Sequence, residues 1–185
     1  MKAVVLFGGT GSRVNSLSKG ENKALISINY KPSAYYVLKN LVNHFSEILI
    51  ITTPKDLTTF KNIASTYFSG FKFSFKTQPT PSGVAHALSY SKTFLEKDEF
   101  FSLILGDFYS EEIPKVLDVY KKEKGSYIVL NKINDPKKYG VFDFKKNKIV
   151  EKPDYFVSDY ADRGFYILNS NCLDLILSLK KNRKD

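Results

Sequence analysis

The chain has 185 residues, close to the roughly 100–200 residues of one domain, and we expect residues 1–185 to form a single domain. Its 43% hydrophobic and 25% charged residues exclude an intrinsically disordered protein, and its one cysteine, Cys172, excludes a disulfide framework or a cysteine-rich zinc site. The net charge of +9 fits nucleic acid, anionic lipid or a phosphorylated small molecule as partner, or simply a solvated surface.

Short apolar runs alternate with helical patterns along the chain. In chain order, the spacing predicts strand 3–7, helix 33–45, strand 47–52, helix 57–68, strand 71–75, helix 83–95, strand 101–105, helix 111–122, strand 127–130, hairpin 141–144 with 148–151, strand 164–168 and helix 172–181. This alternation predicts an α/β fold, with a Rossmann-like, mostly parallel sheet and helices on both faces. No apolar run approaches the roughly 20 residues of a membrane span, so we expect a cytoplasmic protein without a membrane partner.

Three glycines follow the first predicted strand, in Gly8-Gly9-Thr10-Gly11-Ser12-Arg13. Glycines let a backbone turn tightly and bring its N–H groups close to a phosphate. The pattern is neither the dinucleotide fingerprint nor the P-loop, because a third spaced glycine and a Gly-Lys-Ser/Thr end are both missing. Arg13 and, ten residues later, Lys23 supply two cations where a polyphosphate would lie. The loop predicts a phosphate site, with a plain tight turn as the alternative.

Asp107 closes a predicted buried strand directly after Gly106. A carboxylate at the carboxyl end of a parallel strand projects into the crevice where such sheets bind ligands. It suits Mg²⁺, which takes one or two carboxylates together with phosphate oxygens. The alternative is a turn or helix cap, where aspartate is also common.

A loop with two prolines runs from Gln78 to Gly83, just before a predicted helix. The prolines favour an extended path, and Gly83 permits a close backbone approach. Gln78 can both donate and accept at the edge of a base. We expect His86 to pack against the fold rather than to take part in catalysis.

Gly140, Glu151 and Lys152 lie around the predicted hairpin. Lys152 suits a phosphate and Glu151 suits a hydroxyl. From composition alone, a surface ion pair before a turn is the better interpretation.

Together, and in this order, these segments resemble the sugar-nucleotidyltransferases, especially the glucose-1-phosphate thymidylyltransferase and uridylyltransferase type, from Met1 to about Leu168. The resemblance implies the nucleotide-diphospho-sugar transferase fold and nucleotidyl transfer from dTTP or UTP to a sugar 1-phosphate, with Mg²⁺ as cofactor and pyrophosphate as product. We expect no nucleic-acid partner. The implied site residues are Arg13, Lys23 and Lys152 for catalysis, Gly8, Gly9, Gly11, Ser12, Gln78 and Gly83 for the nucleotide, Gly140, Glu151, Lys152 and Tyr166 for the sugar phosphate, and Asp107 for the metal.

Departures from the family pattern bear on activity. Phe108 stands where an Asn often follows the metal-binding Asp, and Arg163 stands where a neutral residue is usual. The family continues to a second Asp in a Trp-Leu-Asp-Thr-Gly-like motif, so we expect this chain to lack the family's C-terminal part. That part often supplies oligomer contacts in the family, so a homo-oligomer is left open.

Two alternative functions remain. The first is a shortened, non-catalytic module of the same fold that binds a nucleotide or a sugar phosphate. The second is a basic nucleic-acid-binding protein, against which stands the position of most aromatic residues within predicted core elements rather than in an exposed stacking row.

Overall fold

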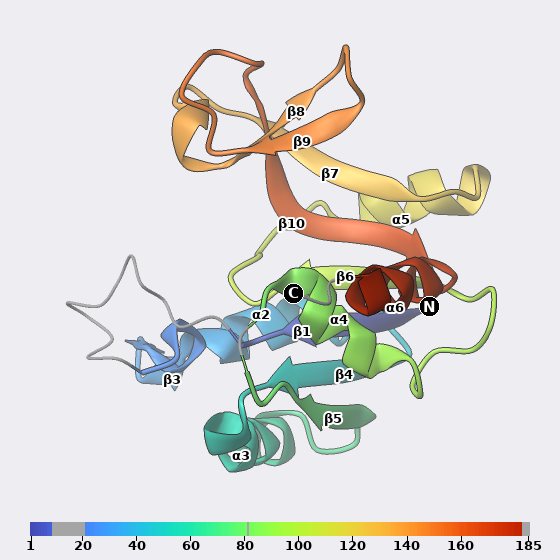
Figure 1. Cartoon of the computed structure of the whole chain (residues 1–185). Helices are drawn as coiled ribbons and strands as arrows, with labels where there is room; N and C mark the ends of the chain where they lie inside the picture. Colours follow the sequence, from blue (N-terminus) through green and yellow to red (C-terminus); the bar gives the residue numbers. More distant parts are fainter. Residues whose placement is uncertain (9–20, 81, 183–185) are drawn as a thin grey trace.

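The computed structural model describes residues 1–8, 21–80 and 82–182, and its centre is an eight-stranded sheet (Figure 1). The strand order is β5-β4-β1-β6-β10-β8-β9, with β7 pairing to β10 beside this path. The strands of the sheet are β1 (Lys2–Leu6), β4 (Glu47–Thr52), β5 (Phe73–Thr77), β6 (Phe100–Leu105), β7 (Tyr127–Lys132), β8 (Gly140–Asp143), β9 (Lys148–Glu151) and β10 (Tyr160–Asn169). A separate hairpin joins β2 (Ser27–Ile28) to β3 (Lys31–Pro32).

The sheet has a parallel part and an antiparallel part. Strands β5, β4, β1 and β6 pair in parallel, whereas β10 pairs antiparallel with β6, β7 and β8, and β8 pairs antiparallel with β9. Figure 1 shows β8 and β9 at one end of the molecule and β5 with α3 at the other. The predicted α/β fold is confirmed. Strand β1, which leads to Gly8, lies in the parallel part of the sheet.

Helices cover both faces of the parallel strands. The helices are α2 (Ser33–Leu41), α3 (Leu57–Tyr67), α4 (Val84–Leu88), α5 (Ile113–Lys122) and α6 (Cys172–Asn182), and the short 3-10 helices are η2 (Lys23–Leu25), η3 (Pro54–Asp56), η4 (Ser89–Ser91) and η5 (Pro136–Lys138). Within this described part of the chain, no helix has both the length and the apolar character that crossing a bilayer requires.

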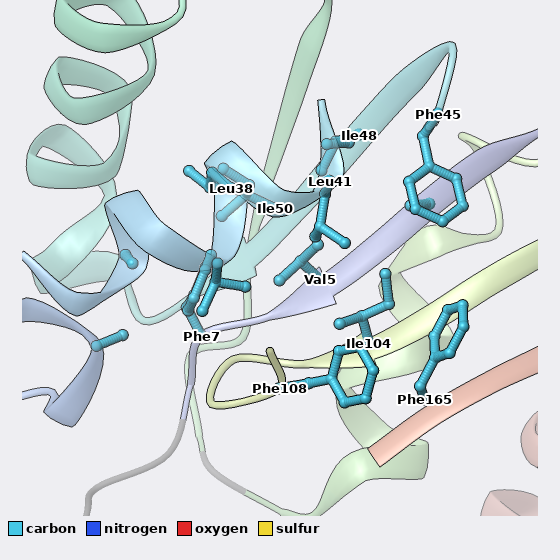
Figure 2. Close-up of a cluster of buried hydrophobic side chains, with 14 of the residues drawn as sticks. Val5, Phe7, Leu38, Leu41, Phe45, Ile48, Ile50, Ile104, Phe108 and Phe165 are labelled. Carbon is cyan, nitrogen blue, oxygen red and sulfur yellow. The ribbon is translucent and has the colours of Figure 1, made fainter. Parts of the chain in front are cut away.

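The two cores follow from the alternation of side chains along β1. Val5 and Phe7 point into a core shared with α2, α3 and α5, and Figure 2 shows them with Leu38, Leu41 and Ile50. Val4 and Leu6 point into the opposite core with α4 and α6. Because successive strand residues face opposite sides, a continuous apolar run such as that of β1 fits a strand buried on both faces.

Three predicted elements differ in length from the structure by four residues or more. The helix predicted over residues 33–45 is too long, since α2 ends at Leu41. The helix predicted over residues 83–95 is wrong in length, since α4 ends at Leu88 and a 3-10 turn follows. The hydroxyls of Ser89 and Ser91 donate to the carbonyls of His86 and Leu88, both at 2.7 Å, and such local bonds compete with a continuing helix. Strand β10 is longer than the predicted 164–168.

Candidate functional site

The carboxyl ends of four parallel strands meet at one edge of the sheet. Leu6 at the end of β1 lies in register with Ile51 and with Leu105 at the end of β6. Thr52 and Thr77 end β4 and β5 in register with each other. The residues that follow these ends therefore gather at the edge where parallel sheets bind ligands.

A buried network joins the end of β1 to the start of the Lys23 turn. Asn22, 4% exposed, donates from Nδ2 to the Phe7 carbonyl at 2.5 Å and to Asp56 Oδ2 at 3.1 Å. Its Oδ1 accepts the Ala24 backbone N–H at 3.1 Å and so caps η2. Thr53 also donates to Asp56 Oδ2, at 2.7 Å. This network fixes the position of Lys23, the next residue.

Lys23 and Asp107 form an ion pair at the carboxyl edge of the parallel strands. The Lys23 ammonium lies 2.5 Å from Asp107 Oδ2, although the two residues are 84 positions apart in the chain. Both side chains keep contact with solvent, at 34% and 62% exposure. An ammonium beside a carboxylate at this edge provides one group for a phosphate and one for a metal ion.

The residues on either side of Asp107 hold it at the rim. Phe108 is buried and stacks on Phe165 with ring centroids 5.1 Å apart, and Figure 2 shows both rings beside Ile104. Gly106 lies so close to β1 that an added Cβ would be 2.5 Å from the Phe7 ring. Because these neighbours are tightly packed, the carboxylate of Asp107 is left facing outward.

Asp107 fits a magnesium ion as a single protein ligand. Among residues 1–8, 21–80 and 82–182, no group of three or more His, Cys, Asp or Glu side chains is arranged to hold a metal. The Asp107 carboxylate already carries one cation, the Lys23 ammonium, and remains accessible. Magnesium keeps several waters and takes phosphate oxygens, so one carboxylate suits a metal that arrives with a nucleotide.

Gln78 lies beside the first residue of the glycine loop. It follows β5, is 5% exposed, and its backbone N–H donates to the Thr52 carbonyl at 2.8 Å. An added Cβ on Gly8 would lie 3.3 Å from Gln78 Oε1. The side-chain nitrogen lies 3.3 Å from the Gly83 carbonyl and 2.8 Å from His86 Nδ1. Gly83 adopts φ +87°, a region that favours glycine, where the chain turns into α4.

A second cluster lies on the antiparallel part of the sheet. Tyr166 donates its hydroxyl hydrogen to Asp162 across a bulge in β10, and Asp162 also accepts the Gly164 N–H at 2.8 Å. Burial, the bond to Asp162 and the charges of Asp162 and Glu151 raise the pKa of Tyr166. An added Cβ on Gly140 would lie 3.1 Å from the Glu151 carboxylate. The predicted sugar-phosphate residues Gly140 and Glu151 thus face one another.

Lys152 is at the edge of this second cluster. Its ammonium lies 3.7 Å from Glu151 Oε1, with more than half of both side chains exposed. Its backbone adopts φ +44°, and its N–H donates to the Tyr139 carbonyl at 3.0 Å. The surface ion pair expected from composition is present, and the exposed ammonium is free to turn toward an anionic ligand.

The structure brings some of the predicted site residues together. Lys23 and Asp107 are brought together, as are Gly8, Gln78 and Gly83. The predicted residues Gly9, Gly11, Ser12 and Arg13 lie outside the described residues. Asn22, Asp56 and Asp162 were not predicted as site residues, and neither was the contact of His86 with Gln78. An Asn just before a short helical turn is an N-cap signal that marks Asn22, whereas no comparable local signal marks the other three.

Comparisons with known proteins agree with this geometry. The family model described as nucleotidyl transferase matches residues 2–185. Glucose-1-phosphate thymidylyltransferases from Neisseria meningitidis and Mycolicibacterium smegmatis are 30% and 31% identical over the whole chain. The chain spans about two thirds of the length of these curated relatives, 67% and 66% respectively.

Two solved structures share the fold. A Bacillus anthracis protein assigned to the glucose-1-phosphate thymidylyltransferases, crystallised with sucrose, superposes with TM-score 0.82 and 30% identity over 97% of this chain and 75% of that chain. A UTP-bound UGPase from Acinetobacter baumannii superposes with TM-score 0.76 and 18% identity over 98% of this chain and 82% of that chain, which shows similarity of fold.

Proposed function

Since the chain belongs to the nucleotidyl transferase family, we propose that it transfers a nucleotidyl group from a pyrimidine nucleoside triphosphate, dTTP or UTP, to a sugar 1-phosphate. The observation that carries this proposal is the meeting of Lys23 and Asp107 beside the strand end that bears Gly8. A cation and a metal-binding carboxylate there are the groups that a polyphosphate needs.

The proposed reaction is a direct displacement at phosphorus. A phosphate oxygen of the sugar 1-phosphate attacks the α-phosphorus of the triphosphate, the bond from α-phosphorus to the β-phosphate oxygen breaks, and pyrophosphate leaves. No covalent bond to the protein is required. The protein therefore contributes by positioning the reactants and by neutralising charge.

In this proposal the triphosphate and its metal ion are bound by Lys23, Asp107 and Arg13. Lys23 would turn from Asp107 toward the α-phosphate, and the exposure of the ion pair supports this because both groups can exchange partners. Asp107 would hold Mg²⁺, which, when bound, makes the α-phosphorus more electrophilic. Arg13 would bind the β- and γ-phosphates, the role implied by the family resemblance.

In this proposal the sugar phosphate is bound by the cluster around Tyr166. Its hydroxyl hydrogen is donated to Asp162, so the phenol oxygen would act toward a ligand as an acceptor. Glu151 is also an acceptor when ionised. Both groups therefore suit sugar hydroxyls, which can donate, while Lys152 suits the phosphate.

The test is pyrophosphate release from dTTP or UTP with Mg²⁺ and glucose 1-phosphate. Asp107→Asn should lower turnover at least about 100-fold, because neutral asparagine is a poor magnesium ligand. Asp118→Asn is the matched control, since Asp118 is also an exposed aspartate paired with a lysine, Lys121, but lies on α5. Triphosphate binding without pyrophosphate release, across a panel of sugar phosphates, would instead support the non-catalytic binding module.

A further inference from the structure

The side-chain amide of Gln78 has a defined polarity. One amide end lies 3.3 Å from the Gly83 carbonyl oxygen, a group that only accepts hydrogen bonds. The NH₂ group must occupy that end, because an oxygen there would face another oxygen. The same nitrogen lies 2.8 Å from His86 Nδ1, so Nδ1 accepts and the ring proton of neutral His86 is on Nε2.

This arrangement uses both amide hydrogens and leaves the oxygen available. Oε1 points to Gly8, since an added Cβ there would lie 3.3 Å from it. Within the described part of the chain, no hydrogen bond reaches Oε1, although Gln78 is 5% exposed. A buried acceptor without a donor is costly, by about 1–3 kcal/mol, and such a group is satisfied when a ligand donates to it.

His86 makes one contact through its ring and another through its backbone. Its ring meets the Tyr90 ring edge to face, with centroids 5.4 Å apart. Its carbonyl accepts the Ser89 hydroxyl at 2.7 Å. The imidazole can therefore serve as a fixed acceptor for Gln78.

We propose that His86 is a positioning residue for base selection: with the Gly83 carbonyl, it holds the Gln78 amide so that an acceptor, Oε1, faces the base. This inference rests on the proposed function, because it assumes that the base binds beside Gly8 and Gln78. Uracil and thymine carry an N–H donor at ring position N3, whereas cytosine carries a lone pair there. The site thus selects bases with a donor at N3, and cytosine must shift its ring to offer its amino group instead.

The experiment measures the affinities of Mg-UTP and Mg-CTP for the whole chain by isothermal titration calorimetry, without sugar phosphate. We expect the wild type to bind UTP about 10–100-fold more tightly than CTP, the range for one lost buried hydrogen bond. His86→Phe keeps a ring against Tyr90 but removes the acceptor, and should bring the two affinities within about threefold. His86→Asn restores an acceptor close to the Nδ1 position and should keep most of the preference. The other histidine of the chain, His44, supplies the control His44→Phe, which should retain the wild-type ratio.

Each other outcome points to a specific failure. Equal wild-type affinities for UTP and CTP would overturn the polarity inference while leaving nucleotide binding intact. A wild-type ratio in His86→Phe, or an equal loss of both affinities, would overturn the role of His86 and reduce it to packing. If neither nucleotide binds the wild type, the proposed function is wrong, and this inference is wrong with it.

Discussion

Replacing Asn22 with alanine removes the group that ties β1, η3 and the Lys23 turn together. The buried side chain makes three hydrogen bonds, to the Phe7 carbonyl, to Asp56 and from Ala24. Loss of the cap costs about 1 kcal/mol. The Phe7 carbonyl and Asp56 each lose a donor, which adds about 1–3 kcal/mol to the loss of stability. The expected loss in the free energy of unfolding is therefore about 2–4 kcal/mol.

Urea unfolding followed by circular dichroism measures this loss. With a slope of about 2 kcal/mol per molar urea, the Asn22→Ala midpoint should fall by about 1–2 M. Asn43→Ala is the matched control, because Asn43 is exposed and its replacement should change the midpoint little. A midpoint for Asn22→Ala within error of this control would show that the hydrogen bonds of Asn22 do not stabilise the fold.

A second variant separates the cap from the network. Aspartate caps helices about as well as asparagine, so a cap-only role predicts that Asn22→Asp keeps wild-type stability. The network predicts the opposite, because a second carboxylate would face Asp56 Oδ2 across the present 3.1 Å contact and would have no hydrogen to donate. We expect Asn22→Asp to be at least as unstable as Asn22→Ala. Wild-type stability in Asn22→Asp would show that the cap alone matters.

Three further predictions concern close packing, acid stability and the sugar site. Gly106→Ala should destabilise the fold by about 1–3 kcal/mol, since its Cβ would lie 2.6 Å from the Leu6 carbonyl oxygen. Gly125→Ala is the control and should be tolerated, because its Cβ would lie 3.6 Å from its nearest neighbour. The urea midpoints of the two variants measure the difference. Burial alone raises the pKa of Glu47, but hydrogen bonds from Lys72 and Ser74 outweigh it and hold this pKa below its usual value. The ionised Glu47 therefore stabilises the fold above about pH 4.3, and this stabilisation is lost as the pH falls. Glu47→Gln should lower the urea midpoint more at pH 7 than at pH 3. An equal loss at both pH values would show that the charge of Glu47 does not stabilise the fold. Tyr166→Phe removes the acceptor oxygen and should raise KM for the sugar phosphate with little change in triphosphate affinity; steady-state kinetics would show an unchanged KM if the phenol does not touch the sugar.

Much of the fold could be predicted because its signals are local. The apolar run that begins with β1 is followed at once by glycine, and β6 is followed by Gly106-Asp107, so both turns could be placed from neighbouring residues. The rule that parallel strands end at one edge then places Asp107 near the glycine loop. The end of α4 at Leu88 was harder to predict, because the sequence does not show whether serine hydroxyls will bond back to the helix or face solvent.

The α/β class could be predicted from the sequence, and so could the edge of the sheet where parallel strands bind ligands. Lys23 and Asp107 could be named as candidates from the sequence, but their ion pair appears only in the fold. The tertiary structure alone decided how the polar groups pair. Asn22 meets Asp56 across 34 residues, and Gln78 turns its oxygen to Gly8 only because Gly83 and His86 occupy its nitrogen. Asp162 and Tyr166 would be about 13 Å apart along a regular strand, and the bulge in β10 brings them into contact. Strands and turns follow from neighbours along the chain, whereas hydrogen-bond partners depend on distances between segments that only the folded register fixes.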